Sequence, residues 1–209
     1  MGSMNNGPFG PIKGKVGNLV SYTLRGKNVV RIAGKTSKPP TLAQLINRQK
    51  MAVTNAFLKP IIPFINLGFL FAIEGTAKHQ HNEALSYNRL HALQGEYPNI
   101  EMDYSKALVS KGSLQSAINP AVSLLANGVE FTWEVAQDME WGIKNDRTML
   151  LAYFPEQQQA IYIFSGAQRK EGRDFLELPA NLLDQPMHTY ISFMADDKTS
   201  VSDSMWRSI

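Results

Sequence analysis

The sequence predicts an α+β protein that is mostly β: a basic N-terminal β-hairpin plus helices, then a C-terminal immunoglobulin-like or fibronectin III-like β-sandwich. Apolar residues recur at helical spacing over 42–57 and 82–94, whereas short alternating runs follow one another after Tyr97. We therefore expect two regions, with a basic arm, β-hairpin and helical region at 1–98 and a β-sandwich domain at 99–209.

Charge is divided unevenly along the chain. The first acidic residue is Glu74, and ten of the 21 basic residues precede it, so a front of +10 is joined to a body of −7. Such asymmetry predicts that the front meets a polyanion or the acidic surface of another copy of the protein. The chain has no cysteine, which excludes disulfides, thiolate zinc sites and cysteine nucleophiles.

The front of the chain combines an irregular arm with a hairpin. Glycine and proline punctuate residues 1–17, so we expect no regular structure there. Two short strand patterns, 18–24 and 28–33, flank a turn that contains Gly26 and Asn28, residue types that tolerate positive φ. The segment 35–40 ends in two prolines and is expected to be an extended linker.

Two helices are expected after this linker. The segment 42–57 carries an apolar stripe at helical spacing, and Thr41 is its expected N-cap. Pro60 should end or kink this helix, because proline lacks the amide hydrogen that a helix interior needs. A second, weaker stripe predicts a helix over 82–94 with Asn82 as its cap.

The most apolar run, 57–73, is expected to be buried chain. It contains Lys59, Pro60 and Gly68, whereas a membrane span needs about 20 mostly apolar residues. The segment before Gly10 has no apolar stretch typical of a signal peptide. We therefore expect a cytoplasmic protein without a membrane span, and release in an assembled particle is a further route out of the cell.

The rest of the chain has the pattern of a β-sandwich, because short strands joined by polar turns recur at intervals of about ten residues. Asn127-Gly128 predicts a hairpin turn, and Val129, Phe131, Trp133 and Val135 alternate toward the expected core. The expected strands are 100–104, 107–110, 121–125, 129–135, 149–154, 160–164, 175–178 and 189–194.

Several stretches together resemble a known family. They are Gly14-Lys15-Val16-Gly17-Asn18-Leu19-Val20, Arg25-Gly26-Lys27-Asn28-Val29-Val30-Arg31, Pro39-Pro40-Thr41-Leu42-Ala43-Gln44 and Gly95-Glu96-Tyr97-Pro98. The chain resembles a family of uncharacterised proteins, a domain of unknown function common in Bacteroidota. This resemblance implies a shared fold and a bacterial source, and it implies no activity, cofactor or functional residue.

The best candidates for metal ligands are two histidines. His79 and His81 would point to the same side of an extended segment, and imidazole nitrogens bind zinc readily. A third ligand would have to be Glu83 or Glu74. The simpler interpretation, a polar loop before a helix, is favoured, and we expect no metal and no cofactor. The isolated His91 is expected to be a packed, hydrogen-bonded side chain, as is His188.

No catalytic signature is present, so we expect a non-enzymatic structural or interaction protein that assembles with itself or docks a partner through its basic front. The residues expected to make these contacts are Arg25, Lys27, Arg31, Lys35 and Lys38.

Two alternatives stay open. The basic hairpin could bind nucleic acid, with Tyr22 or Phe9 stacking on bases. The sandwich could instead bind a carbohydrate or another ligand through exposed aromatic residues such as Trp141 and Trp206.

Overall fold

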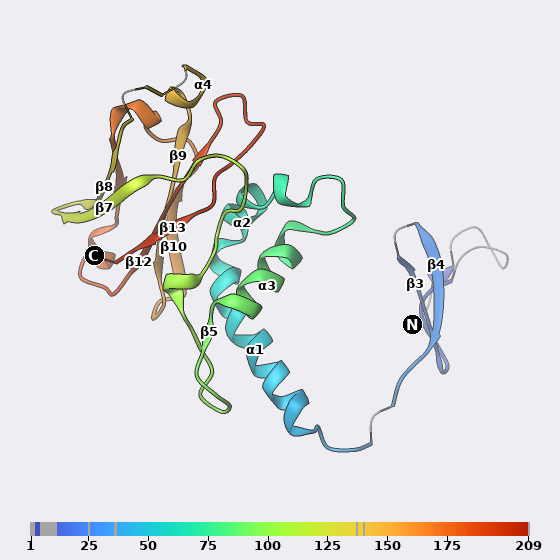
Figure 1. Ribbon diagram of the computed structural model, residues 1–209. Helices are drawn as coiled ribbons and strands as arrows, with labels where there is room; N and C mark the ends of the chain where they lie inside the picture. Colours follow the sequence, from blue (N-terminus) through green and yellow to red (C-terminus); the bar gives the residue numbers. More distant parts are fainter. Residues whose placement is uncertain are drawn as a thin grey trace. The chain divides into compact units, whose positions relative to one another are not determined.

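The computed structural model describes residues 3–4, 12–24, 26–35, 37–136, 138–139 and 141–208, without the side chains of Ser3, Met4 and Trp141. The chain divides into two compact units, Met1–Thr41 and Leu42–Ile209 (Figure 1). The division therefore falls after Thr41, not between residues 98 and 99 as the sequence predicted.

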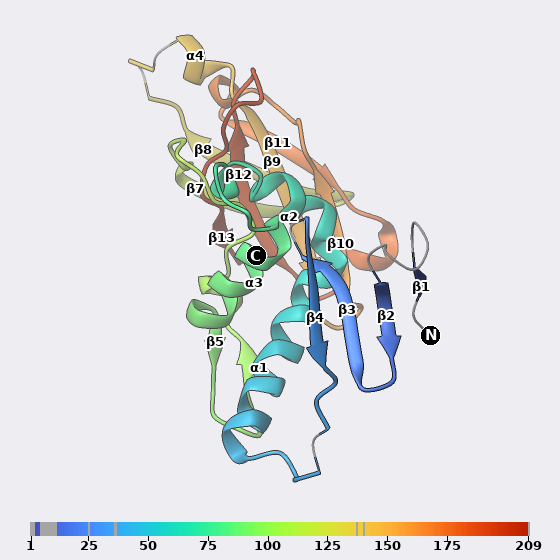
Figure 2. The ribbon, with the colours of Figure 1, turned by 90° about the vertical axis from the view of Figure 1, so that its right-hand side faces the viewer.

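The first unit is an antiparallel sheet in the order β1–β2–β3–β4, and Figure 2 shows its last three strands side by side. Its strands are β1 (Ser3–Met4), β2 (Ile12–Val16), β3 (Leu19–Leu24) and β4 (Lys27–Ile32). The predicted hairpin is confirmed as β3 and β4. The sequence missed β2, because its glycines resemble loop punctuation. Gly14 and Gly17 have positive φ, and Gly17 lies in the tight turn that brings β2 onto β3.

The second unit begins with helices. They are α1 (Leu42–Leu58), a 3₁₀ turn (Lys59–Ile61), α2 (Ile62–Gly68), a second 3₁₀ turn (Phe71–Ile73) and α3 (Gln80–His91). Pro60 ends α1 as expected, and the predicted first helix is confirmed. The α3 helix begins two residues earlier than expected, because the side chain of His79, not Asn82, caps it. Within the described residues, no helix has both the length and the apolar character needed to cross a membrane.

Two antiparallel sheets follow, one in the order β11–β8–β7 and the other in the order β10–β9–β12–β13. The strands are β7 (Ile118–Leu125), β8 (Gly128–Glu134), β9 (Arg147–Phe154), β10 (Gln159–Ile163), β11 (Arg173–Glu177), β12 (His188–Met194) and β13 (Met205–Arg207). A short hairpin of β5 (Leu93–Gln94) and β6 (Glu101–Met102), a 3₁₀ turn (Tyr104–Lys106) and α4 (Trp141–Lys144) complete the major elements. Of the predicted strands, 107–110 is wrong, since this segment is irregular, and 100–104 is reduced to β6.

One core lies between the two sheets. Phe131 and Trp133 of β8 share a buried cluster with Leu150 of β9 and Phe193 of β12. The predicted alternation in β8 is therefore confirmed up to Trp133. Val135 lies beyond the end of β8 and is exposed, so its predicted place in the core is wrong.

The other face of the four-stranded sheet is covered by the helices (Figure 1). Met149, Leu151 and Tyr153 of β9 lie in one buried cluster with Phe57 and Phe64. The second unit thus has three layers, with helices on one side of β9 and a second sheet on the other. Because β9 is buried on both sides, no boundary between structural units falls at residue 98. The prediction that the apolar run 57–73 contributes buried chain is confirmed.

Candidate functional site

The N-terminal sheet has two chemically different faces. Side chains alternate along a strand, and the register pairs Leu19 with both Val16 and Ile32. We call the side formed by Val16, Leu19, Ser21, Thr23, Asn28, Val30 and Ile32 the uncharged face. We call the side formed by Lys15, Val20, Tyr22, Leu24, Lys27, Val29 and Arg31 the basic face.

The uncharged face is apolar and open. Val16, Leu19, Val30 and Ile32 are between 47% and 73% exposed, and Ser21 is buried among them. From Gly14 to Ile32, no described charged residue lies on this face. An apolar sheet face is normally buried against another element, because its side chains are otherwise left in water. A partner that covers the uncharged face would therefore stabilise the sheet.

The basic face carries its cations in rows across the strands. Val20 pairs with Lys15 on one side and Arg31 on the other, so two cations flank the middle strand. Two residues further along β3, Tyr22 pairs with Val29, and beyond it Leu24 pairs with Lys27. An exposed aromatic ring therefore lies between two cationic rows.

The five predicted contact residues are only partly brought together. The structure places Lys27 and Arg31 on the basic face, and Arg25 lies outside the described residues. Lys35 and Lys38 follow β4 as exposed residues of the linker. Sequence reasoning missed Lys15, because β2 was expected to be irregular.

The charge split follows the structural division. The unit Met1–Thr41 holds seven of the 21 basic residues and none of the 18 acidic residues, which gives +7 against −4 for Leu42–Ile209. All the net positive charge of the protein therefore lies in its small N-terminal unit.

Comparison with known proteins gives one match. A family of unknown function (DUF6266) matches residues 11–207. The chain belongs to this family. No curated protein and no solved structure matches the chain. The DUF6266 match spans both structural units, and β2, β3 and β4 of the N-terminal sheet lie within the matched residues.

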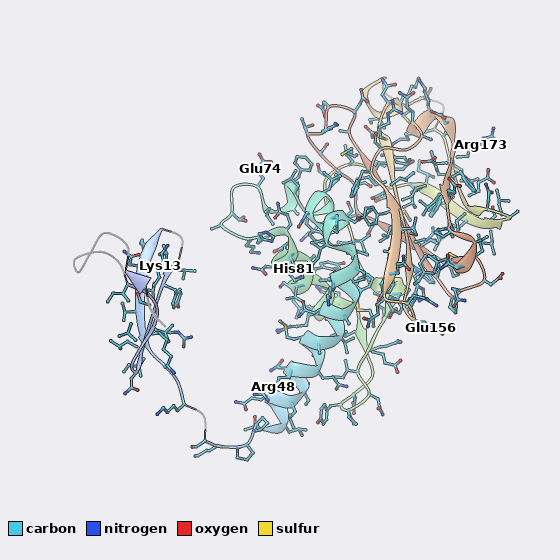
Figure 3. The ribbon with its side chains drawn as sticks, turned by 180° about the vertical axis from the view of Figure 1, so that it is seen from behind. Lys13, Arg48, Glu74, His81, Glu156 and Arg173 are labelled. Carbon is cyan, nitrogen blue, oxygen red and sulfur yellow. The ribbon has the colours of Figure 1, made fainter. Side chains whose placement is uncertain are left out.

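The predicted histidine pair of this DUF6266 protein is not assembled into a metal site. His79 Nδ1 accepts a hydrogen bond from the backbone amide of His81, which lies in the first turn of α3. Glu83 instead binds Lys78 at 2.7 Å and Lys111 at 3.3 Å, and Glu74 lies away from His81 in the loop before α3 (Figure 3). Within the described ranges, no three His, Asp or Glu side chains gather to hold a metal ion.

Glu83 should contribute a small, pH-dependent stability. Hydrogen bonds from Lys78, and secondarily from Lys111, hold the pKa of Glu83 below its ordinary value. Its contribution is therefore present above the ordinary glutamate pKa of about 4.3 and is lost as the pH falls further. We expect Glu83→Gln to lower the free energy of unfolding by less than about 1 kcal/mol at neutral pH, because both lysines are partly exposed. Urea unfolding at neutral and acidic pH measures this, and an equal loss at both pH values would contradict it.

The prediction of a packed, hydrogen-bonded histidine is confirmed for His188 but not for His91, which is exposed at the end of α3. His91 contacts the ring of Tyr87, and His188 stacks on Tyr104 with ring centroids 4.1 Å apart. Trp206 Nε1 donates to His188 Nδ1, and burial lowers the pKa of His188. Trp206 is thus half-buried rather than displayed as a sugar platform, and the side chain of Trp141 lies outside the described residues.

A buried ion pair was not foreseen from the sequence. Arg169 Nη2 lies 3.1 Å from Asp146 Oδ2, and both side chains are almost inaccessible to water. The guanidinium group also donates to the carbonyl of Gln115 and lies 3.7 Å from the ring centroid of Phe193. Burial raises the pKa of Asp146 and lowers that of Arg169, and the contact between them opposes both shifts. The pair joins the segment before β9 to the 3₁₀ turn (Arg169–Glu171) before β11.

Proposed function

We propose that this protein is a non-enzymatic assembly protein, in which the N-terminal sheet holds copies of the chain together. The observation that carries the proposal is the uncharged face, where four large apolar side chains are between 47% and 73% exposed on a regular sheet. Removing one such side chain from water contributes about 1 to 3 kcal/mol. Covering the whole face therefore contributes several kcal/mol, against a cost of about 0.5 to 1 kcal/mol for ordering each Leu or Ile side chain.

A second copy is the partner that fits this surface. Two uncharged faces can pack as stacked sheets, about 10 Å apart, and such an interface is self-complementary. Lys15, Lys27 and Arg31 all lie on the opposite side, so the two +7 units meet without placing these cations in contact. A partner with a charged surface would gain nothing from a face without charge.

The second unit then serves as the body that the sheet assembles. We further propose that its two sheets form a fibronectin III-like module. Support comes from the strand order: the neighbours β11–β8–β7 correspond to E–B–A, and β9–β12–β13 correspond to C–F–G, of immunoglobulin-like folds. In this scheme β10 takes the place of an added C′ strand beside β9.

Light scattering coupled to size-exclusion chromatography tests the assembly proposal. We expect the full chain to elute as an oligomer and Ile32→Lys to shift it to a monomer, because a charge would enter the apolar interface. Leu24→Lys is the matched control, since Leu24 is also exposed (54%, against 73% for Ile32) but lies on the basic face.

Deletion of residues 1–35 should give the same monomer as Ile32→Lys. A full chain that is monomeric at low and high salt would contradict the proposal. Equal dissociation by Ile32→Lys and Leu24→Lys would contradict the choice of face.

A further inference from the structure

The basic face combines charge and an aromatic ring in one plane. Lys15 and Arg31 flank Val20, and Lys27 lies opposite Leu24 at the other end of β3. Tyr22 is 38% exposed on the middle strand between these two rows. Residues two apart on a strand are about 7 Å apart, so the ring and both cationic rows are within reach of one extended ligand.

We infer that the basic face binds single-stranded nucleic acid, with Lys15, Lys27 and Arg31 on the phosphates and Tyr22 stacked on a base. Proteins that bind single strands without sequence preference combine a cationic track with aromatic stacking platforms. The N-terminal unit supplies both, and its lack of any acidic residue removes the usual source of repulsion of a phosphate chain.

A single strand fits the arrangement better than other polyanions do. In a duplex the bases are stacked on one another, so a ring projecting from the middle of a flat sheet has no base to stack on. An acidic protein surface would pair with the cations but would leave Tyr22 without a specific partner. The aromatic residue at the centre of the cations is therefore the observation that selects unpaired bases.

This inference is independent of the assembly proposal, because it uses the opposite side of the sheet. A monomeric protein could still bind nucleic acid through the basic face. An oligomer that does not bind nucleic acid would contradict this inference but not the assembly proposal.

Fluorescence anisotropy with a labelled oligothymidylate of about 20 nucleotides tests the inference on the full chain. Three phosphate contacts predict that affinity falls about twentyfold as salt rises from about 50 to about 200 mM. Tyr22→Ala should weaken binding about tenfold or more, and Tyr22→Phe should preserve it, because phenylalanine keeps the stacking ring. Thr23→Ala, on the uncharged face, is the control and should leave binding unchanged.

Charge and stacking can be separated by a further variant. Lys15→Gln combined with Arg31→Gln should reduce the magnitude of the salt slope by about 1.4, the value expected for two lost contacts to a single strand. Three results would overturn the inference: no binding at low salt, Tyr22→Ala binding as tightly as the unmodified chain, or a duplex of the same length binding more tightly than the single strand. Circular dichroism of each variant confirms that the sheet is retained.

Discussion

Asp146→Ala should lower the free energy of unfolding by about 3 to 5 kcal/mol, because it leaves the guanidinium group of Arg169 buried without its counter-charge. The contacts of Arg169 with Gln115 and Phe193 hold the cation in place, so it cannot move to water without disturbing the loop around it. A loss of this size is a large fraction of the 5 to 15 kcal/mol that is typical of a folded domain.

The control for this prediction is a second ion pair, whose arginine directly follows Asp146 in the sequence. Asp196 also pairs with an arginine, Arg147, but at 3.8 Å and with its side chain 62% exposed. Asp196→Ala should therefore cost less than about 0.5 kcal/mol, as exposed ion pairs usually do. Urea unfolding followed by tryptophan fluorescence measures both variants. Equal losses for the two would show that burial does not determine the contribution of the Asp146–Arg169 pair.

Replacing both partners tests the cause. The double variant Asp146→Leu with Arg169→Met removes both charges and fills the space with apolar atoms. It should be more stable than Asp146→Ala, since no uncompensated charge remains buried. A double variant less stable than Asp146→Ala would indicate that the hydrogen bonds of Arg169 to backbone carbonyls, not its charge pair, dominate.

Local patterns predicted local structure well. The stripe of α1 and the alternation of β8 each depend on neighbours a few residues apart, and both are confirmed. The strand β2 was missed for a local reason, because Gly14 and Gly17 adopt positive φ inside and beside a strand that pairs on both sides. The two faces of the N-terminal sheet depend on the register of its strands. Because β2 was not predicted as a strand, its register could not be predicted either.

Contacts between segments far apart in the sequence were the main feature that the sequence did not predict. Asp146 and Arg169 are 23 residues apart, and no spacing rule links them. The double burial of β9 did leave a signal, since Met149–Phe154 is apolar throughout and does not alternate, which is typical of a strand covered on both faces. That signal does not say which other segments supply the cover, and the helices that do so lie far away in the sequence.

A fragment of residues 99–209, the domain that the sequence predicted, should fail to form a stable native fold. Without the helices, it would expose Met149, Leu151, Tyr153 and Tyr190, which are all buried in the cluster that contains Phe57. An apolar sheet face of this kind is an aggregation hazard. A fragment of residues 42–209 keeps both layers around β9 and should unfold in one cooperative transition.

The dependence of the sheets on the helices can also be tested in the full chain, by replacing Phe57. Its ring contacts Tyr153 edge-to-face at 5.0 Å and Tyr104 at 5.7 Å, and it is almost fully buried. We expect Phe57→Ala to cost about 3 to 5 kcal/mol, against less than about 0.5 kcal/mol for Leu42→Ala, whose side chain is 62% exposed on the same helix.

The fragments also separate folding from assembly. Near-ultraviolet circular dichroism and urea unfolding should show native packing for 42–209 and none for 99–209, because only the longer fragment covers both faces of β9. Cooperative unfolding of 99–209 with a native near-ultraviolet spectrum would contradict the three-layer interpretation. Because 42–209 lacks the N-terminal sheet, we also expect it to be monomeric. A folded but monomeric 42–209 beside an oligomeric full chain would place stability in the second unit and association in the first.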